Sequence, residues 1–160
     1  RILGLAENIR PMKGGNKTAT GRRGILPVEQ TDLGEELWRL DFRSEDVFLL
    51  VNERIPDLAD RVRFDPGVFA LIYPGIIREV LMHAFDEDVD PAEDDESWAA
   101  LWLKFGTRLH IDNSPPPLNE TMEEQNEWIS DVVAGFCQDH TLRDKFVQTA
   151  GSGTGWGDQT

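Results

Sequence analysis

The sequence predicts an α+β domain, in which a small antiparallel sheet from the N-terminal half packs against three or four helices from the C-terminal half. Two patterns lead to this prediction. Between residues 25 and 55, apolar residues alternate with polar ones or form short runs, as they do in strands. From residue 65 onward they recur every three or four residues, which is typical of amphipathic helices. We expect one domain over 25–150, between a basic arm or flexible loop at 1–24 and a Gly-rich tail or linker at 151–160.

The predicted sheet contains an edge strand and a hairpin. Residues 25–28 begin the first strand, and Pro27 favours an edge position because proline cannot donate a ladder hydrogen bond. Residues 38–42 alternate between apolar and polar, as in a half-buried strand. Residues 47–51 form a continuous apolar run, which indicates a strand buried on both faces. The four residues 43–46 between the last two segments predict a hairpin loop.

Capping residues mark where the predicted helices begin. Asp65 precedes a proline, and this pair is typical of a helix start. The same helix should kink or break at Pro74, which removes a backbone donor. Ser97 predicts the start of a second helix, and Thr121 opens a capping box that begins a third. A shorter helix is expected over 141–148.

Two connectors between the predicted helices have unusual compositions. Residues 86–96 hold eight acidic residues and no basic one. A calcium-binding EF-hand loop needs a central glycine, which this run lacks, so we expect a solvated acidic loop. Residues 113–117 end in three consecutive prolines, which predict a stiff, extended connector.

Large apolar side chains at the inward positions of these elements predict the core. Burial of such side chains is the main favourable contribution to folding. We expect the core to include Trp38, Leu40, Phe42, Phe48, Leu50, Phe69, Ile76, Leu81, Trp98, Trp102, Phe105, Trp128, Val132 and Phe136.

Charge is distributed unevenly along the chain, whose net charge is −14. Residues 1–28 hold six basic residues and one acidic residue, whereas residues 29–160 hold 10 basic and 29 acidic ones. The acidic body should repel nucleic acid and anionic membranes, so we expect no membrane partner. Any contact with phosphate groups should therefore use the basic arm.

The basic arm supplies candidate phosphate-binding residues. Lys17 and Thr18 follow two glycines, as in a phosphate-binding loop, but Asn16 occupies the final glycine position of that motif. The following residues also predict loop and strand rather than the required helix. The arm is therefore either a plain solvated loop or an accessory contact to nucleic-acid or nucleotide phosphates. The residues that would make this contact are Arg10, Lys13, Lys17, Arg22 and Arg23.

A metal-dependent hydrolase is a third alternative. Glu79 and His83 lie four residues apart, on one face of a predicted helix. His110 and Asp112 alternate along a possible extended segment. Imidazole and carboxylate groups of this kind can bind a metal, but the spacing matches no established motif. Structural or surface histidines are the more common explanation of such a pattern.

Compartment and chain context follow from a few further observations. Cys137 is the single cysteine, so no intrachain disulfide can form, which fits a reducing compartment. No signal peptide and no uninterrupted apolar run of the roughly 18–20 residues that span a bilayer is visible. We therefore expect a cytoplasmic protein. The chain begins with Arg1 and an apolar segment, which indicates a piece of a longer chain.

The sequence holds no complete catalytic signature and no cofactor-binding motif. This favours a non-enzymatic interaction or scaffolding module of a larger intracellular, bacterial-type multidomain protein. Its partners would be other domains or subunits of the same assembly, with nucleic acid as an alternative partner of the basic arm. No cofactor is expected.

Overall fold

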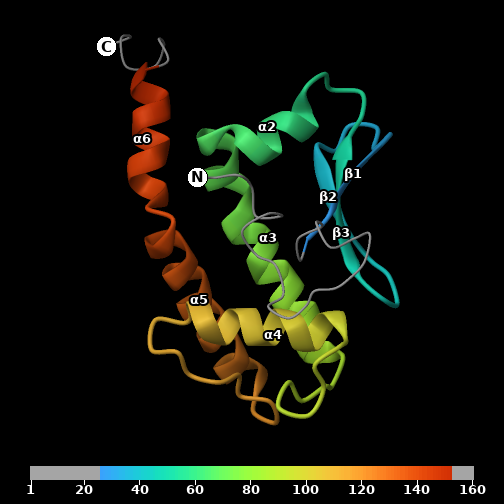
Figure 1. Ribbon diagram of the computed structural model, residues 1–160, viewed down its shortest axis with the longest axis vertical. Coiled ribbons are helices and arrows are strands. Elements are labelled where there is room, and N and C mark those ends of the chain that lie inside the picture. The colour runs from blue at the N-terminus through green and yellow to red at the C-terminus, as the bar shows by residue number, and fades with distance from the viewer. Residues whose placement is uncertain (1–25, 153–160) are drawn as a thin grey trace.

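The computed structural model describes residues 26–152, and the basic arm at 1–24 lies outside them. A small three-stranded sheet lies in the N-terminal half and five described helices follow it, so the α+β prediction is confirmed (Figure 1). The elements are β1 (Val28–Thr31), β2 (Trp38–Phe42), β3 (Val47–Asn52), α2 (Leu58–Phe64), α3 (Pro66–Asp86), α4 (Trp98–Leu109), α5 (Met122–Asp139) and α6 (Leu142–Ser152).

The sheet is mixed, with strand order β1-β3-β2. β2 and β3 form the predicted antiparallel hairpin, closed by a 2.8 Å hydrogen bond from Arg43 N to Asp46 O. β1 lies at the edge, as Pro27 predicted, but pairs in parallel with β3. The prediction of a wholly antiparallel sheet is therefore wrong. β1 and β2 run in opposite directions, and β3 lies between them. Because β3 is antiparallel to β2, it is parallel to β1.

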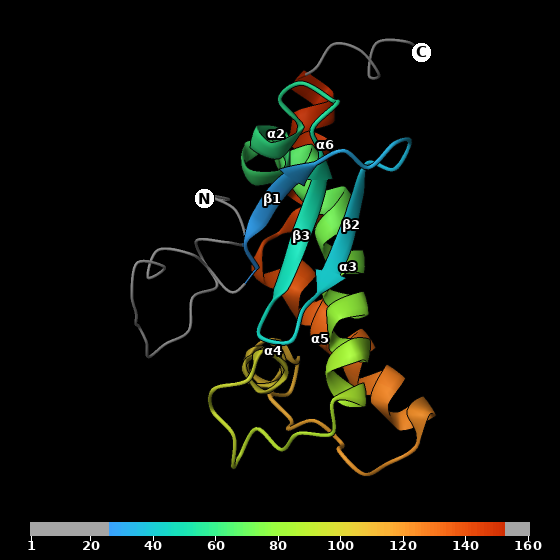
Figure 2. The same ribbon diagram turned by 90° about the vertical axis from the view of Figure 1, so that its right-hand side faces the viewer.

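Only one face of the sheet packs against helices. The buried residues Val47, Leu49 and Val51 of β3 point to that face. Phe48 and Leu50 point to the opposite face and are half-buried, so the prediction that β3 is buried on both faces is wrong. The reason is that no described helix covers the outer face (Figure 2).

The outer face of the sheet instead carries charged residues. The guanidinium of Arg43 lies 3.8 Å from the centre of the Phe48 ring. The same guanidinium pairs with Glu29 at 2.9 Å and with Asp41 at 2.7 Å. These hydrogen bonds, that to Glu29 most of all, raise the pKa of Arg43.

The α3 helix lies between the sheet and the α5–α6 pair, and α4 crosses one end of it (Figure 1). α5 and α6 run antiparallel to α3. Near one end of α3, a Cβ placed on Gly67 would lie 3.3 Å from Thr149 of α6. In the middle, Arg78 Nη1 donates to Ser130 Oγ at 3.1 Å. Near the other end, the rings of Phe85 and Trp128 meet edge to face at 5.7 Å.

The α3 helix continues from Pro66 to Asp86 with Pro74 inside it, so of the predicted kink or break at Pro74 the break does not occur. Proline costs one backbone hydrogen bond, but the neighbouring Tyr73, Ile76 and Ile77 are fully buried. Their packing holds the helical path. By length and composition α3 could also cross a membrane, with a mean hydropathy of 1.4. Core helices meet the same criteria, and its buried residues belong to the core cluster.

The predicted helix starts are confirmed. Asp65 accepts hydrogen bonds from the first turn of α3, Ser97 caps α4, and Thr121 forms the capping box of α5. α2 was not predicted, because its first turn follows Asp57 at a φ of 66° without a side-chain cap. α6 extends to Ser152, into the segment predicted as a tail.

Ten of the fourteen predicted core residues are buried. The other four are half-buried, because Phe48 and Leu50 face outward while Trp38 and Phe42 belong to the edge strand β2. The buried ten are Leu40, Phe69, Ile76, Leu81, Trp98, Trp102, Phe105, Trp128, Val132 and Phe136.

Candidate functional site

The predicted phosphate-binding residues lie outside the described part of the chain, so their role stays a prediction. These residues are Arg10, Lys13, Lys17, Arg22 and Arg23.

The four candidate metal ligands are divided between two parts of the fold. Glu79 and His83 belong to α3, and the ring of His83 stacks on Phe42 of β2 with centroids 3.9 Å apart. His110 and Asp112 follow the end of α4. Within residues 26–152, no three His, Cys, Asp or Glu side chains are grouped to hold a metal ion. The structure therefore does not bring the four candidates into such a group.

His110 fastens the chain that leaves α4. It is 6% exposed, and its Nδ1 accepts hydrogen bonds from the backbone N–H groups of Asp112 at 3.0 Å and Ser114 at 3.4 Å. Its Nε2 lies 3.4 Å from Oδ2 of Asp131, and its ring stacks on Trp128. Because Nδ1 accepts, the ring proton is assigned to Nε2. His110 and Asp112 are thus in contact, but through the backbone N–H of Asp112 and not through its carboxylate.

The proline connector is fixed by side chains of α5. Trp128 Nε1 donates to Ser114 O at 2.8 Å. Gln125 Nε2 donates to Pro117 O at 3.2 Å and to Leu118 O at 3.3 Å. The connector is thus held against α5 by hydrogen bonds at both of its ends.

The first residue of the connector is fixed to the end of α4. Asn113 has a φ of 55°, and its Nδ2 donates to the carbonyl groups of Thr107 at 3.2 Å and Arg108 at 3.0 Å. These carbonyls belong to the last turn of α4, whose carbonyl groups lack partners within the helix. The connector therefore leaves the helix in a fixed direction.

The acidic loop that precedes α4 is also ordered by its own side chains. Asp90 Oδ1 accepts from Ala92 N at 2.9 Å, and Asp94 Oδ1 accepts from Glu96 N at 2.9 Å. The bonds from Glu96 and Ser97 lower the pKa of Asp94, with a smaller contribution from Lys104. These carboxylates therefore close turns within the loop, and Asp94 also holds the backbone of Ser97, the residue that caps α4.

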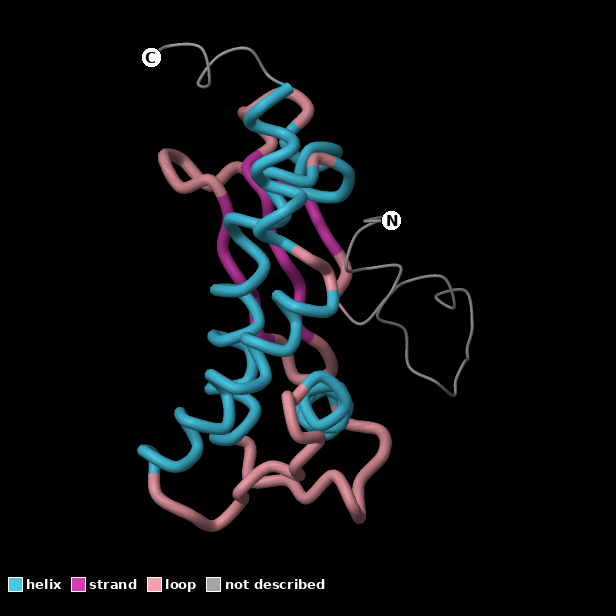
Figure 3. Tube along the Cα trace, turned by 90° about the vertical axis from the view of Figure 1, so that its left-hand side faces the viewer, coloured by secondary structure: helices cyan, strands magenta, loops and turns pink. Residues whose placement is uncertain are grey.

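An open groove lies where α4 and these two segments meet. Figure 3 shows both loops gathered at the same end of the molecule as α4. The groove has a volume of about 330 Å³, and its walls are largely apolar. It is lined by Asp90, Pro91, Ala92, Lys104, Thr107, Arg108, Pro115, Pro116 and Leu118.

Two basic side chains lie on the α4 wall of the groove. Lys104 and Arg108 are four residues apart and therefore share one face of the helix. Neither forms an ion pair within the described part of the chain, whereas Arg39, Arg43 and Arg54 each pair with a carboxylate. The groove therefore combines apolar walls with two cations that form no ion pair in the described chain, although Lys104 interacts with Asp94 beyond ion-pair distance.

The sequence carries a signal for this pair, although neither residue is among the candidate site residues predicted above. Lys104 and Arg108 are the only basic residues between Arg78 and Arg143, a stretch that contains 16 acidic residues. Two isolated cations at helical spacing in such a stretch indicate a local role. Their proximity to the proline connector, in contrast, depends on the fold.

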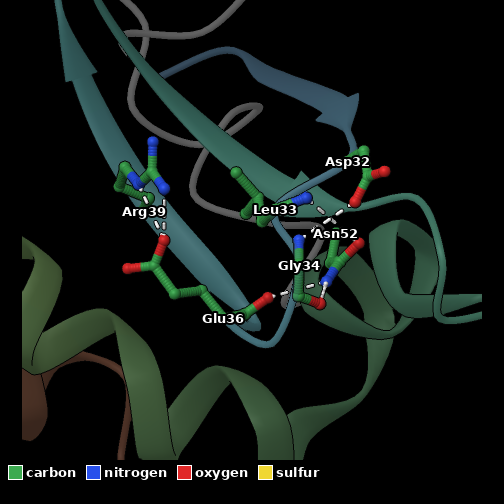
Figure 4. A network of polar contacts seen from close by, with 6 residues as sticks. All are labelled: Asp32, Leu33, Gly34, Glu36, Arg39 and Asn52. Atoms are coloured by element: carbon green, nitrogen blue, oxygen red, sulfur yellow. Dashed lines mark hydrogen bonds and ion pairs between the residues drawn. The ribbon is translucent and has the colours of Figure 1, made fainter.

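A second polar cluster lies at the sheet end of the molecule, around Asn52 (Figure 4). Asn52 is 2% exposed, and its Nδ2 donates to Gly34 O at 2.9 Å and Glu36 O at 2.8 Å. Its Oδ1 accepts from Leu33 N at 3.4 Å and Arg54 N at 3.0 Å. Both donors and both acceptor positions of the amide are thus used within the fold. This cluster fixes the loop between β1 and β2 and leaves the amide no capacity for a ligand.

No family model matches the chain, and no curated protein or solved structure is significantly similar to it.

Proposed function

We propose that this domain is a non-enzymatic interaction module that binds a partner polypeptide through the groove beside α4. The observation that carries this proposal is the pair Lys104 and Arg108, two cations that form no ion pair with a carboxylate of the described chain, next to an apolar wall. Apolar pockets with a few well-placed polar groups are the usual form of binding sites. The partner would be another domain or subunit of a larger intracellular assembly.

The way in which the groove is built supports binding rather than catalysis. His110 lies behind the connector with its Nδ1 occupied by two backbone donors and its Nε2 directed at Asp131. Such a histidine holds a wall in place and has no nitrogen available for proton transfer to a ligand. A wall that is already ordered before binding also lowers the entropic cost of association.

A crosslinking experiment tests this proposal without assuming the chemistry of the partner. A photoreactive amino acid is placed at Thr107, inside the groove, in the intact protein and in the cell that produces it. The control position is Glu53, which is exposed and follows β3 at the sheet end. We expect one adduct of discrete mass from position 107 and none from position 53.

The captured chain must then be identified, purified and mixed with the unmodified domain. We expect saturable binding with a fixed stoichiometry, which replacement of groove residues weakens. Equal adducts from positions 107 and 53, or a captured chain that does not bind after purification, would contradict the proposal.

A further inference from the structure

We infer that the ligand of this groove is a short acidic peptide segment in which an apolar side chain lies close to a carboxylate. This inference rests on the proposed function and specifies its ligand. Charge complementarity favours such a ligand. Lys104 and Arg108 form no ion pair within the described chain, and Asp94 acts on Lys104 only beyond ion-pair distance, so a carboxylate that enters the groove can form charge-assisted hydrogen bonds with them.

The charges around the groove limit how acidic the ligand can be. Asp90 also lines the groove, and the segment 86–96 to which it belongs holds eight acidic residues. A nucleic acid brings a phosphate charge at every nucleotide and gains affinity from many cations at once. Two cations beside an acidic loop favour a ligand with one or two carboxylates over such a polyanion.

The apolar part of the groove specifies the second feature of the ligand. Pro91, Pro115, Pro116 and Leu118 contribute apolar surface, and the connector is held by hydrogen bonds from α5. The volume of about 330 Å³ lies at the lower end of the range for ligand pockets, roughly 300–1,000 Å³. It therefore fits an apolar side chain and its neighbours rather than a folded surface.

The hydrogen-bond acceptors that line the groove favour a peptide as the ligand. Thr107 lines the groove, and its hydroxyl donates its proton to Leu103 O at 3.1 Å. The hydroxyl oxygen can then only accept a further hydrogen bond. Asp90, which also lines the groove, is a further acceptor. A peptide supplies backbone N–H donors to such groups together with its side-chain carboxylate, and a fatty acid would supply none.

The test is a selection from a random peptide library displayed against the 160-residue chain. We expect enrichment of peptides with Asp or Glu one to three positions from a large apolar residue. Synthetic copies of these peptides should bind the chain with an affinity that falls as salt concentration rises. Their dissociation constants are measured by fluorescence anisotropy.

The decisive comparison uses two double variants with the same change in charge. Lys104→Glu with Arg108→Glu should weaken the selected peptides at least tenfold, whereas Arg143→Glu with Lys145→Glu on α6 should leave the affinity within twofold. Lys104→Gln with Arg108→Gln, which adds no repulsion, should give an intermediate loss. Circular dichroism confirms that each variant is folded.

Three results would overturn the inference. The selected peptides could lack acidic residues, the two Glu double variants could bind equally, or a single-stranded oligonucleotide could compete for the groove as well as the peptides. If crosslinking at position 107 still captures a binding partner, only the ligand chemistry is wrong. If that crosslink is also absent, the proposed function fails with it.

Discussion

The two ends of the molecule fix their loops in different ways. At the sheet end, one side chain, Asn52, makes four hydrogen bonds to the backbone of the chain around it. At the α4 end, three side chains fix the connector: His110 and Trp128 bind the backbone of Ser114, and Gln125 binds that of Pro117. The first arrangement closes a turn onto itself. The second holds an extended segment at several points and leaves one side of it available to line a groove.

Buried polar residues that bind backbone groups can have different roles in the same fold. Asn52 and His110 are the two buried polar residues of the described chain, and both have partners on the backbone. Only His110 holds a segment that lines a pocket. The role of such a residue is therefore set by whether the segment that it holds lines a site, and not by the residue type.

The largest effect is expected from Gly135, which lets α5 approach the end of α4. A Cβ at this position would lie 1.8 Å from Leu109 O, where backbone and not a flexible side chain must move. Gly135→Ala should lower the free energy of unfolding by at least about 3 kcal/mol, the upper end of usual overpacking costs. Urea denaturation measures this change.

Gly75→Ala is the matched control, because a Cβ at Gly75 on α3 meets nothing within 4 Å. This variant should be more stable than the parent by up to about 1 kcal/mol, since alanine is the better helix former. If Gly135→Ala were as stable as Gly75→Ala, the close approach of the two helices would be wrong.

Asn52→Ala tests the sheet end and should rank second. The variant leaves the carbonyls of Gly34 and Glu36 without their amide donor, and we expect a loss of about 2–3 kcal/mol in unfolding free energy. The affinity for groove peptides should not change, because no groove residue contacts this loop. A loss of both stability and affinity would show that the two ends are coupled.

Gln125→Ala tests the connector and should give the opposite result. Gln125 is half-buried and donates to two carbonyls, so the unfolding free energy should fall by about 1 kcal/mol or less. The peptide affinity should fall several-fold, because the wall of the groove is less ordered before binding. Gln138→Ala, at an exposed position of the same helix, is the control and should change neither quantity.

The smallest effect at neutral pH is expected from Tyr73, which fixes no loop. Its hydroxyl is buried without a hydrogen-bond partner in the described chain, so Tyr73→Phe should change the unfolding free energy by less than about 1 kcal/mol. Burial raises the pKa of Tyr73, which a more distant Arg63 lowers slightly. A raised pKa means that the unfolded state releases the proton first. Stability is therefore fully present below about pH 10 and falls as pH rises further.

Tyr73 is the only tyrosine in the chain, so phenolate absorbance reports on it alone. We expect the phenolate signal to appear together with loss of the circular dichroism signal, and Tyr73→Phe to unfold at a higher pH than the parent. Ionisation of Tyr73 near pH 10 in a chain that stays folded would contradict its burial.

Local signals in the sequence predicted the elements well. Asp65, Ser97 and Thr121 each act within the first turn of their own helix, so their meaning does not depend on the rest of the fold. Long-range packing explains the errors. Pro74 stays within a helix because its buried neighbours hold it there, and Phe48 is half-buried because no described helix covers its side of the sheet.

The candidate site was predictable only in part. The proline connector and the acidic loop were both identified, and the spacing of Lys104 and Arg108 was available in the sequence. The sequence did not predict that these segments and the two cations line one groove, because this depends on how α4 packs across the end of α3. His110 was singled out as a metal ligand, whereas the fold uses it to hold backbone.

The strand order has a consequence for the ribosome-bound chain. β3 is the last of the three strands to be synthesised, yet it is the central one, and β1 and β2 contact it rather than each other. No ladder can form until residues 47–52 have left the exit tunnel. Asn52, the last residue of β3, then closes the β1–β2 loop from the far end. Sheet assembly during translation should therefore occur as one late event, and not strand by strand.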